Sequence, residues 1–297
     1  MRVLVSGASG LVGSEVIRQL KAEGHEALRL VRRKASAVDE VEWDPSRGYL
    51  QPGIMETIDA VVNMAGATTG KIPWTSKYKE EIVSSRLDST RTLVAAMQSA
   101  KRRPEVLVSG SASGFYGDSG ERILSESAPK GTGFLSDLAH AWEQEALKAP
   151  TDVRVVLART TMVMSRKLGA LGRLLPLIKL GIGGPLGSGK QWWAWISLPD
   201  EAAAIIHLIK TPSAKGAYNL TAPEPATCGE IVKELAKSLS RPSLIAVPSF
   251  ALKALIGEAA VELLLCSQNM SADRLLKTGF KFQHPTLHEA ATWVTKR

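Results

Sequence analysis

Three glycines near the start of the chain are spaced for binding the phosphates of a dinucleotide. Gly7, Gly10 and Gly13 stand between an apolar run at residues 3–5 and an amphipathic stretch at residues 11–22. The apolar run predicts a buried parallel strand, and the amphipathic stretch predicts a helix. Gly7 would allow the tight turn, Gly10 the close approach of a pyrophosphate, and Gly13 the packing of helix on strand. The free N–H groups and the positive end of the helix would then face the phosphates.

The whole turn is therefore expected to contact a cofactor. The expected contacts are Gly7, Ser9, Gly10, Leu11, Val12 and Gly13. Because a strand, a glycine turn and a helix follow in the required order, the pattern is more specific than a glycine triplet alone. The alternative is a tight turn that binds no ligand.

Two arginines bear on the choice of cofactor. Residues 25–33 predict the second strand, which ends in Arg32 and Arg33. An acidic residue about 20 positions beyond the glycines would bind a ribose 2′-hydroxyl, whereas arginine there suits a 2′-phosphate. A guanidinium can also stack on adenine and bridge phosphate oxygens. The pair therefore favours NADP(H), and the alternative is two solvated cations at the end of a strand.

The elements that must position these residues alternate along the first 165 residues. Strands alternating with helices predict an α/β fold with a doubly wound parallel sheet, in which ligands bind at the carboxyl ends of the strands. The glycine turn, the loop after Asn63, the run from Ser109 to Ser113 and Arg159 all fall at such ends. The expected strands lie at 59–63, 106–109 and 153–157, and the expected helices at 11–22, 77–99 and 134–147.

Composition excludes several classes of protein. With 297 residues, 44% of them hydrophobic and 22% charged, the chain can bury a large core. No 18-residue apolar run is present, so we expect no membrane span and no membrane partner. Cys228 and Cys266 are too few for a disulfide framework or a zinc site, which predicts a reducing cytoplasm and no metal. The net charge of +8 is scattered, which favours small anionic ligands over specific nucleic acid. We expect a monomer or a homodimer.

The sequence changes character after residue 165. Residues 169–189 are rich in glycine and leucine, and three of the seven tryptophans follow within four residues. We therefore expect a cofactor-binding domain at 1–165 and, at 166–297, a smaller α/β substrate lobe with a C-terminal helical segment. Gln191, Trp192 and Trp193 are candidate lining residues of a substrate pocket, and packing in the core is the equally weighted alternative.

Together these motifs resemble the short-chain dehydrogenase/reductase superfamily, and more closely its atypical epimerase branch, whose members resemble nucleoside-diphosphate-sugar epimerases with a DUF1731-like C-terminal lobe. The resemblance covers nearly the whole chain, and its most specific piece is the block GIGGPLGSGKQWWAWIS at 181–197. Other matching pieces are GASGLVG at 7–13, SASGFYG at 111–117, Trp142-Glu143 and Gly279-Phe280-Lys281-Phe282. The resemblance implies a Rossmann domain that binds NADP(H) and a small substrate lobe.

The resemblance extends the expected cofactor site beyond the glycine turn. Glu81 and Arg86 are expected to approach the ribose and the phosphates, with a surface ion pair as the alternative. The remaining expected contacts are Met64, Ala65, Gly66, Arg159 and Val163.

Catalysis is where the chain departs from the superfamily it resembles. The superfamily moves a proton with a tyrosine and a lysine four residues later. Alignment on Trp142-Glu143 puts Leu135 and Ala139 at those positions, and neither side chain can carry a proton. Ser111 stands where the superfamily keeps a serine that hydrogen-bonds the reacting oxygen. Tyr116, five residues on, is a candidate acid or base, and a packed aromatic residue is the favoured alternative.

Three functions remain open from the sequence. The first is an NADP(H)-dependent oxidoreductase or epimerase that acts on a small polar substrate such as a nucleotide sugar. The second is a non-catalytic NADP(H)-binding sensor or assembly factor, which the missing tyrosine and lysine favour. The third is a nucleic-acid or protein scaffold, which only the net charge supports.

Overall fold

The described part of the chain, residues 1–166 and 170–296 of a computed structural model, is built around one large sheet. The sheet has eight strands in the order β11-β8-β6-β5-β1-β2-β3-β4. Every pair is parallel except β3 with β4. The strands are β1 (Arg2–Ser6), β2 (Glu26–Val31), β3 (Glu40–Asp44), β4 (Tyr49–Leu50), β5 (Ala60–Asn63), β6 (Val106–Ala112), β8 (Arg154–Thr160) and β11 (Gly216–Leu220).

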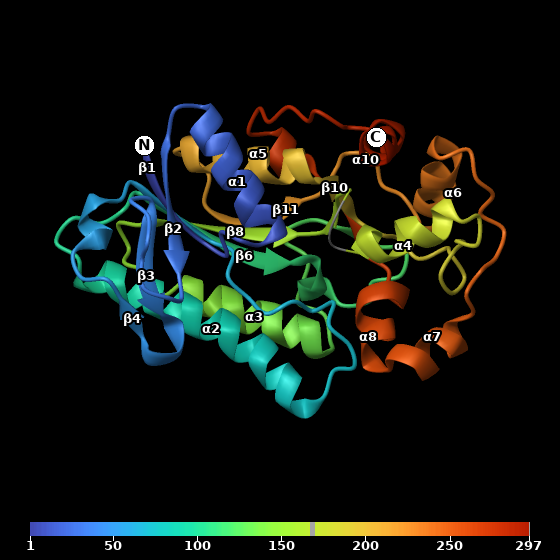
Figure 1. Ribbon diagram of the computed structural model, residues 1–297, viewed down its shortest axis with the longest axis horizontal. Coiled ribbons are helices and arrows are strands. Elements are labelled where there is room, and N and C mark those ends of the chain that lie inside the picture. Colours follow the sequence, from blue (N-terminus) through green and yellow to red (C-terminus); the bar gives the residue numbers. More distant parts are fainter. Residues whose placement is uncertain (167–169, 297) are drawn as a thin grey trace.

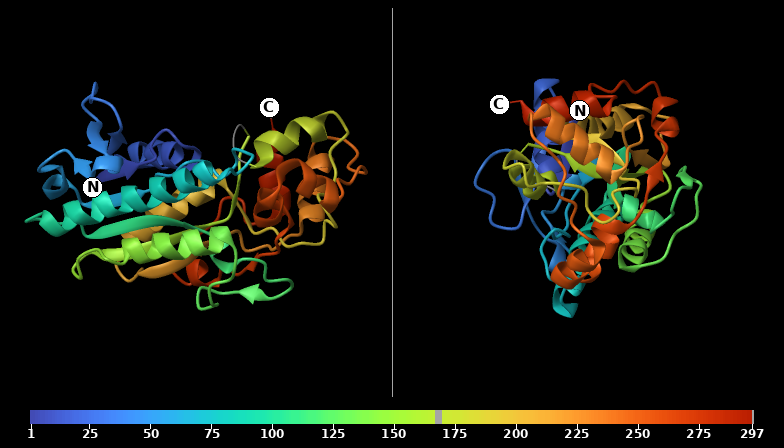
Figure 2. Two further views of the ribbon diagram at one scale, coloured as in Figure 1. Left: turned by 90° about the horizontal axis from the view of Figure 1, so that it is seen from below. Right: turned by 90° about the vertical axis from the view of Figure 1, so that its right-hand side faces the viewer.

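Helices cover both faces of this sheet, as a doubly wound fold requires. In Figure 1, α1 (Leu11–Ala22) and α5 (Leu198–Lys210) lie above the sheet, and α2 (Ser76–Ser99) and α3 (Phe134–Ala146) lie below it. Figure 2 shows α2 and α3 side by side across the lower face. The central strands are buried on both sides because helices cover both, so their sequences are continuous apolar runs.

A second, smaller core lies at the end of the molecule remote from the N-terminus (Figure 1). The helices there are α4 (Ala170–Lys179), α6 (Cys228–Ser238), α7 (Ser249–Ile256), α8 (Glu258–Ala260) and α10 (Leu287–Thr295). Two short parallel pairs accompany them: β9 (Met162–Met164) with β10 (Trp195–Ser197), and β7 (Ile123–Leu124) with β12 (Asn269–Met270). Near β12 lies α9 (Asp273–Leu276). The short turns η1, η2, η3 and η4 span Pro45–Arg47, Ile54–Thr57, Ser113–Tyr116 and Val261–Leu265.

The structure confirms the α/β fold with a doubly wound parallel sheet and a smaller C-terminal lobe. The helix expected at 11–22 has these bounds. Two strands are longer than expected, because β6 and β8 pair with each other as far as Ala112 and Thr160. Ser111 and Arg159 therefore lie on strands rather than in loops after them.

The chain crosses back to the main sheet within the segment expected to be the lobe. After β10 it forms α5, which packs on α1, and β11, which pairs with β8 at the edge of the sheet. The lobe is thus assembled from separate stretches of the chain. Residues 167–169 and Arg297, which also belong to the segment 166–297, lie outside the described residues. Among the described residues, no helix has the length and apolar character to cross a bilayer.

Candidate functional site

The glycine turn between β1 and α1 has no room for side chains at two of its three glycines. Gly7 has φ +63°, and a Cβ there would lie 2.4 Å from the carbonyl oxygen of Met64. A Cβ on Gly13 would lie 2.3 Å from the carbonyl oxygen of Gly7. Gly13 therefore lets α1 pack against the turn, as the sequence predicted. A Cβ on Gly10 would meet only the Gly7 carbonyl oxygen, at 3.1 Å, so protein packing alone does not require glycine at this position.

The N-terminus of α1 is open. Gly10 is the residue that precedes the helix, no side chain caps it, and the first turn holds no acidic residue. Ser9 and Gly10 are exposed, and Leu11 and Val12 are half-buried. Uncapped N–H groups at the positive end of a helix bind anions. This end of α1 therefore fits a pyrophosphate by its own chemistry.

A second loop lies against the glycine turn, at the point where the strand order reverses. β5 is the neighbour of β1 on the side opposite β2, and ligands of doubly wound sheets bind at such a switch point. Ser6 fixes the loop after β5, because its Oγ donates to Asn63 Oδ1 at 2.6 Å and accepts from the N–H groups of Met64 and Ala65. Asn63 Nδ2 donates to Thr90 Oγ1 at 2.9 Å.

Sequence reasoning missed the roles of Ser6 and Thr90 in this loop. One signal was available: Ser6 is a polar residue at the end of an apolar strand, and Thr90 is one of several buried polar residues on α2. Met64 and Ala65 are half-buried, and Gly66 is exposed beside the glycine turn. The structure therefore brings the two expected cofactor loops together.

The two arginines after β2 have different surroundings. Arg33 binds Glu40 through both guanidinium nitrogens, at 2.6 and 2.8 Å, and the hydrogen bonds from Arg33 hold the pKa of that carboxyl down at about 2. Arg32 is exposed, and its guanidinium has no hydrogen bond or ion pair with any residue that the structure describes. Arg32 is thus the arginine available for a 2′-phosphate.

Arg86 supports the loop after β5 from α2. Its Nη1 donates to the carbonyl oxygens of Ala67 and Ile82, both at 3.0 Å, and its guanidinium lies over the ring of Trp142. A Cβ on Gly66 would lie 2.9 Å from Arg86 Cζ, so the guanidinium packs directly on that glycine. Burial lowers the pKa of Arg86 to about 10, which leaves it protonated at neutral pH.

Glu81 is exposed on the same helix, and the described residues show no ion pair between Glu81 and Arg86. The surface ion pair considered from the sequence is therefore not formed. Whether either residue contacts a cofactor stays a prediction.

Ser111 belongs to a buried polar network at the carboxyl ends of β6 and β8. Its Oγ donates to Glu143 Oε1 at 2.6 Å. Arg159 binds both oxygens of Glu143, with Nε–Oε1 at 2.8 Å and Nη2–Oε2 at 3.0 Å. The Arg159 guanidinium also stacks 3.6 Å from the ring centroid of Phe115. All three guanidinium nitrogens of Arg159 are engaged within the protein, which favours a positioning role over a cofactor contact.

Tyr116 completes this network from the far side of Arg159. Its side chain is fully buried, its hydroxyl donates to Asn219 Oδ1 at 2.7 Å, and it accepts from Arg159 Nη1 at 2.8 Å. Burial raises the pKa of the Tyr116 hydroxyl, so the group stays protonated. These contacts favour the interpretation of Tyr116 as a packed residue that fixes Arg159.

The helix that would carry the superfamily tyrosine and lysine begins at Phe134. Leu135 is half-buried and packs against Gly114, because a Cβ built on Gly114 would lie 3.0 Å from the Leu135 Cβ. Ala139 is 2% exposed. The carboxylate of Glu262, from η4 in the lobe, accepts hydrogen bonds from the backbone N–H groups of Phe134 and Leu135. Neither Leu135 nor Ala139 can exchange a proton, and a carboxylate from the lobe lies at the start of this helix.

The residues proposed for a substrate pocket pack within the lobe. Gln191 donates to the carbonyl oxygens of Leu186 and Leu264, and Trp193 Nε1 donates to Leu264 as well. Trp192 is half-buried, and its Nε1 donates to Glu121 Oε2 at 2.7 Å. These contacts favour the packing interpretation. Val163, expected at the cofactor, is a buried residue of β9 paired with Ile196.

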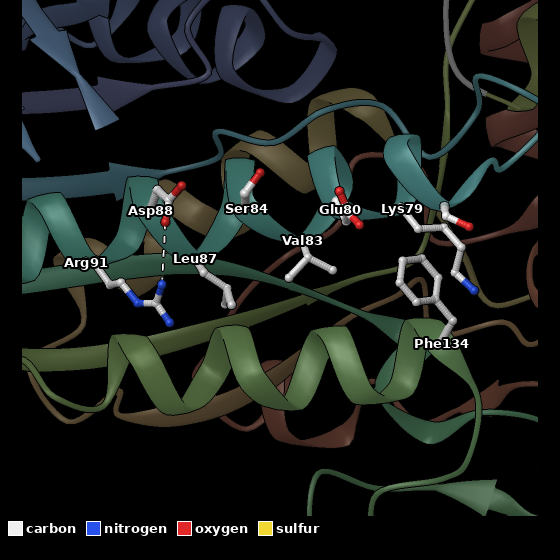
Figure 3. Close-up of a pocket in the computed structure, with 9 residues that line it drawn as sticks. Lys79, Glu80, Val83, Ser84, Leu87, Asp88, Arg91 and Phe134 are labelled. Atoms are coloured by element: carbon white, nitrogen blue, oxygen red, sulfur yellow. Dashed lines mark hydrogen bonds and ion pairs between the residues drawn. The ribbon is translucent and has the colours of Figure 1, made fainter. Parts of the chain in front are cut away.

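A cavity lies elsewhere on the molecule, away from the glycine turn. It measures about 580 Å³ and lies on the outer side of α2, lined by Lys79, Glu80, Val83, Leu87 and other residues (Figure 3). Phe134 closes one end, and an Asp88–Arg91 pair lies at the other. None of the expected site residues lines this pocket, so we do not assign it to the cofactor. No cluster of metal-ligating side chains was found among the described residues.

Family models match most of the chain. Residues 3–221 match the NAD dependent epimerase/dehydratase family, and residues 247–294 match DUF1731, a domain of unknown function. The first match ends directly after β11 and covers the whole main sheet except Arg2, the first residue of β1.

Curated relatives match this chain over nearly its whole length. An epimerase family protein of Mycobacterium leprae is 37% identical over 99% of this chain and 96% of its own. The chloroplastic SDR39U1 homolog of Arabidopsis thaliana is 37% identical over 98% of this chain and 85% of its own.

Two solved structures are similar to this chain in fold. Human epimerase family protein SDR39U1, crystallised with NADPH, is 30% identical with a TM-score of 0.92, and the match covers 99% of both chains. A nucleoside-diphosphate sugar epimerase of Corynebacterium glutamicum is 26% identical with a TM-score of 0.80, over 98% of this chain and 57% of that one.

Proposed function

The chain belongs to the NAD dependent epimerase/dehydratase family, and from that premise we propose that it binds NADP(H) and acts as an oxidoreductase or epimerase on a small polar substrate. The observation that supports the cofactor is the open N-terminus of α1, together with Arg32 after β2, whose guanidinium has no partner among the residues that the structure describes. The human relative was crystallised with NADPH, which agrees with an arginine rather than an acid at this position.

The residues present fit this cofactor. The glycine turn and the first turn of α1 would hold the pyrophosphate, Arg32 the 2′-phosphate, and the loop at Met64 to Gly66 the adjoining part of the dinucleotide. When bound, NADP(H) would supply or accept a hydride. The protein would orient the substrate and exclude water, with the hydrogen-bonded pair Ser111 and Glu143 as candidate polar groups on β6 and α3.

For the substrate we propose a nucleotide sugar as the first class to test. The support is the name of the Corynebacterium relative, a nucleoside-diphosphate sugar epimerase. A scattered net charge of +8 also suits an anionic substrate.

A second candidate, a non-catalytic NADP(H) sensor, is favoured by a specific observation. Leu135 and Ala139 cannot carry a proton, and Tyr116 is enclosed by Asn219 and Arg159. General acid–base catalysis raises a reaction rate by about 10²–10⁴-fold, so a site without a proton carrier would turn over slowly at most.

Turnover of bound NADPH separates the two candidates. The protein is mixed with NADPH and a panel of nucleotide sugars and carbonyl compounds, and oxidation is followed at the nicotinamide absorbance. Slow but substrate-dependent oxidation supports the oxidoreductase. An epimerase consumes no net NADPH, so conversion of each nucleotide sugar to its epimer is measured in parallel with NADP⁺ as the cofactor. Tight NADPH binding with neither activity supports the sensor. Rapid reduction of many carbonyls would show that another acid is present.

Tyr116→Phe tests the remaining acid or base candidate. Loss of activity with unchanged NADPH affinity and unchanged melting temperature would show that Tyr116 moves a proton. Unchanged activity with a lower melting temperature would show a packing residue. The buried hydrogen bonds predict the second result, at a cost of about 1–3 kcal/mol.

A further inference from the structure

Exposed apolar side chains gather at the outer end of the lobe. They lie on three segments: the end of α4 and the residues after it, the connection from α6 to α7, and α7 itself (Figure 1). Leu180 is 73% exposed, Leu244 87%, Phe250 75% and Leu255 78%. We call this set the lobe patch: Leu180, Ile182, Leu244, Ile245, Phe250 and Leu255.

Backbone contacts join the segments that carry the patch. Gly187 N donates to the Val247 carbonyl at 2.8 Å, and Val247 N donates to the Pro185 carbonyl at 2.9 Å. A Cβ built on Gly181 would lie 3.5 Å from Pro242 Cγ, so these two stretches run close together. α7 begins at Ser249, directly after this paired stretch. The apolar side chains are therefore presented from one connected surface rather than scattered singly.

The surroundings of the patch are cationic. No acidic residue occurs between Asp152 and Asp200, nor between Glu234 and Glu258, and all three patch-forming segments fall within these two stretches. The side chains of Lys179, Lys190, Arg241 and Lys253 are exposed, and in the described chain none of them has an ion pair or hydrogen bond.

The nearest acidic side chains are engaged away from the patch. Glu258 pairs with Lys79 of α2, and Glu262 accepts from the start of α3. Glu230 closes a capping box with Thr227 at the start of α6. Because these carboxylates are already paired and the four cations are not, the segments of the patch carry a net positive charge.

We propose that the lobe patch binds the surface of a membrane containing anionic phospholipids. Exposed Phe and Leu side chains would enter the boundary between headgroups and acyl chains, and the four cations would face the anionic headgroups. A second copy of this chain is disfavoured as the occupant, because two patches with the same positive rim would repel each other. The sequence alone predicted no membrane partner because it offered no spanning segment, and a peripheral surface requires none.

Vesicle sedimentation tests the proposal. The full-length protein is mixed with vesicles of equimolar phosphatidylglycerol and phosphatidylcholine, or of phosphatidylcholine alone, at low and high salt. Binding is expected to the anionic vesicles only, and to weaken with salt. The Phe250→Ser/Leu255→Ser double variant should bind at least tenfold more weakly. Each of Lys179→Gln and Lys253→Gln should weaken binding about fivefold.

The matched control is Ile123→Ser, which removes a 69% exposed side chain outside the patch and should bind like wild type. An NADPH-induced rise in melting temperature shows whether each variant is folded, whatever its vesicle binding. The absence of binding to anionic vesicles, or equal binding by the double variant and wild type, overturns the proposal. A dimer that the double variant abolishes, without vesicle binding, would assign the patch to a second copy.

Discussion

Arg32 is the residue on which the choice between NADP(H) and NAD(H) depends. It is exposed and unpartnered in the described chain, whereas Arg33 is held by Glu40. One charge-assisted contact to a 2′-phosphate contributes roughly 1.5–3 kcal/mol, which is about tenfold or more in affinity. We expect wild type to prefer NADPH by this factor and Arg32→Asp to erase or reverse the preference.

Titration of both cofactors, followed by fluorescence, measures this preference. Arg33→Gln is the control, because its guanidinium is already occupied, and it should change the ratio of the two dissociation constants little. Equal dissociation constants for NADPH and NADH in wild type would remove the basis of the assignment.

The glycines of the turn separate ligand binding from folding. Gly10→Val should abolish NADPH binding without unfolding the protein, because a side chain there meets little of the protein but blocks the pyrophosphate. Gly13→Ala should instead destabilise the fold by about 1–3 kcal/mol or more, since its Cβ would lie 2.3 Å from the Gly7 carbonyl oxygen.

Thermal melting with and without NADPH distinguishes the two variants. A ligand at 100 times its dissociation constant stabilises by about 2.7 kcal/mol, so the rise is readily seen in wild type. If Gly10→Val kept this rise, the cofactor would lie elsewhere.

At the scale of elements, α5 carries a buried carboxyl group against β8. Glu201 is fully buried, Thr160 Oγ1 donates to its Oε1 at 2.7 Å, and no group bonds its Oε2 among the described residues. Burial raises the pKa of Glu201 to about 8 from an ordinary 4.5. The folded protein therefore holds a proton that the unfolded chain releases above pH 4.5. The stability that this proton contributes is present below pH 4.5 and is lost as the pH rises to about 8.

Glu201→Gln should reveal this dependence. The amide keeps the size of the side chain and cannot ionise, so the variant should be more stable than wild type at pH 8 by about 1 kcal/mol or more. At pH 4.5 the advantage should vanish. Urea unfolding across this range measures it, and Glu80→Gln, on an exposed position of α2, is the control. A stability difference that did not grow with pH would contradict a buried, protonated Glu201.

Elements that depend on local pattern were predictable from the sequence. The strand, glycine turn and helix at residues 2–22 follow from apolar periodicity and glycine spacing, and the structure confirms them. The roles of Ser111 and Tyr116 were not predictable, because Glu143, Arg159 and Asn219 come from three other elements. The lobe patch was hidden for a similar reason, since a sequence does not show which leucines a fold leaves uncovered.

At the scale of the whole molecule, Glu262 joins the lobe to the main domain. Gly133 provides no side-chain cap for α3, and Glu262 takes that place from a segment more than a hundred residues away. Loss of a cap costs about 1 kcal/mol. Glu262→Ala should lower stability by this amount in urea unfolding.

Glu258→Ala is the companion variant. It removes a carboxylate that forms a partly solvent-exposed ion pair with Lys79, and surface pairs contribute about 0–1 kcal/mol. Equal losses in the two variants would mean that the helix cap is not the stronger contact between the lobe and the main domain.

Because β11 is synthesised long after β8, the edge of the main sheet stays unpaired during part of translation. β8 ends at Thr160, but its outer neighbour β11 is not translated until Leu220. During the intervening sixty or so residues, β8 is the outermost strand of the nascent sheet, with unpaired N–H and C=O groups along an apolar edge. An exposed edge of this kind can form β-sheet hydrogen bonds with other chains and so promote aggregation. Chaperone protection would therefore matter most in the interval between translation of β8 and synthesis of β11.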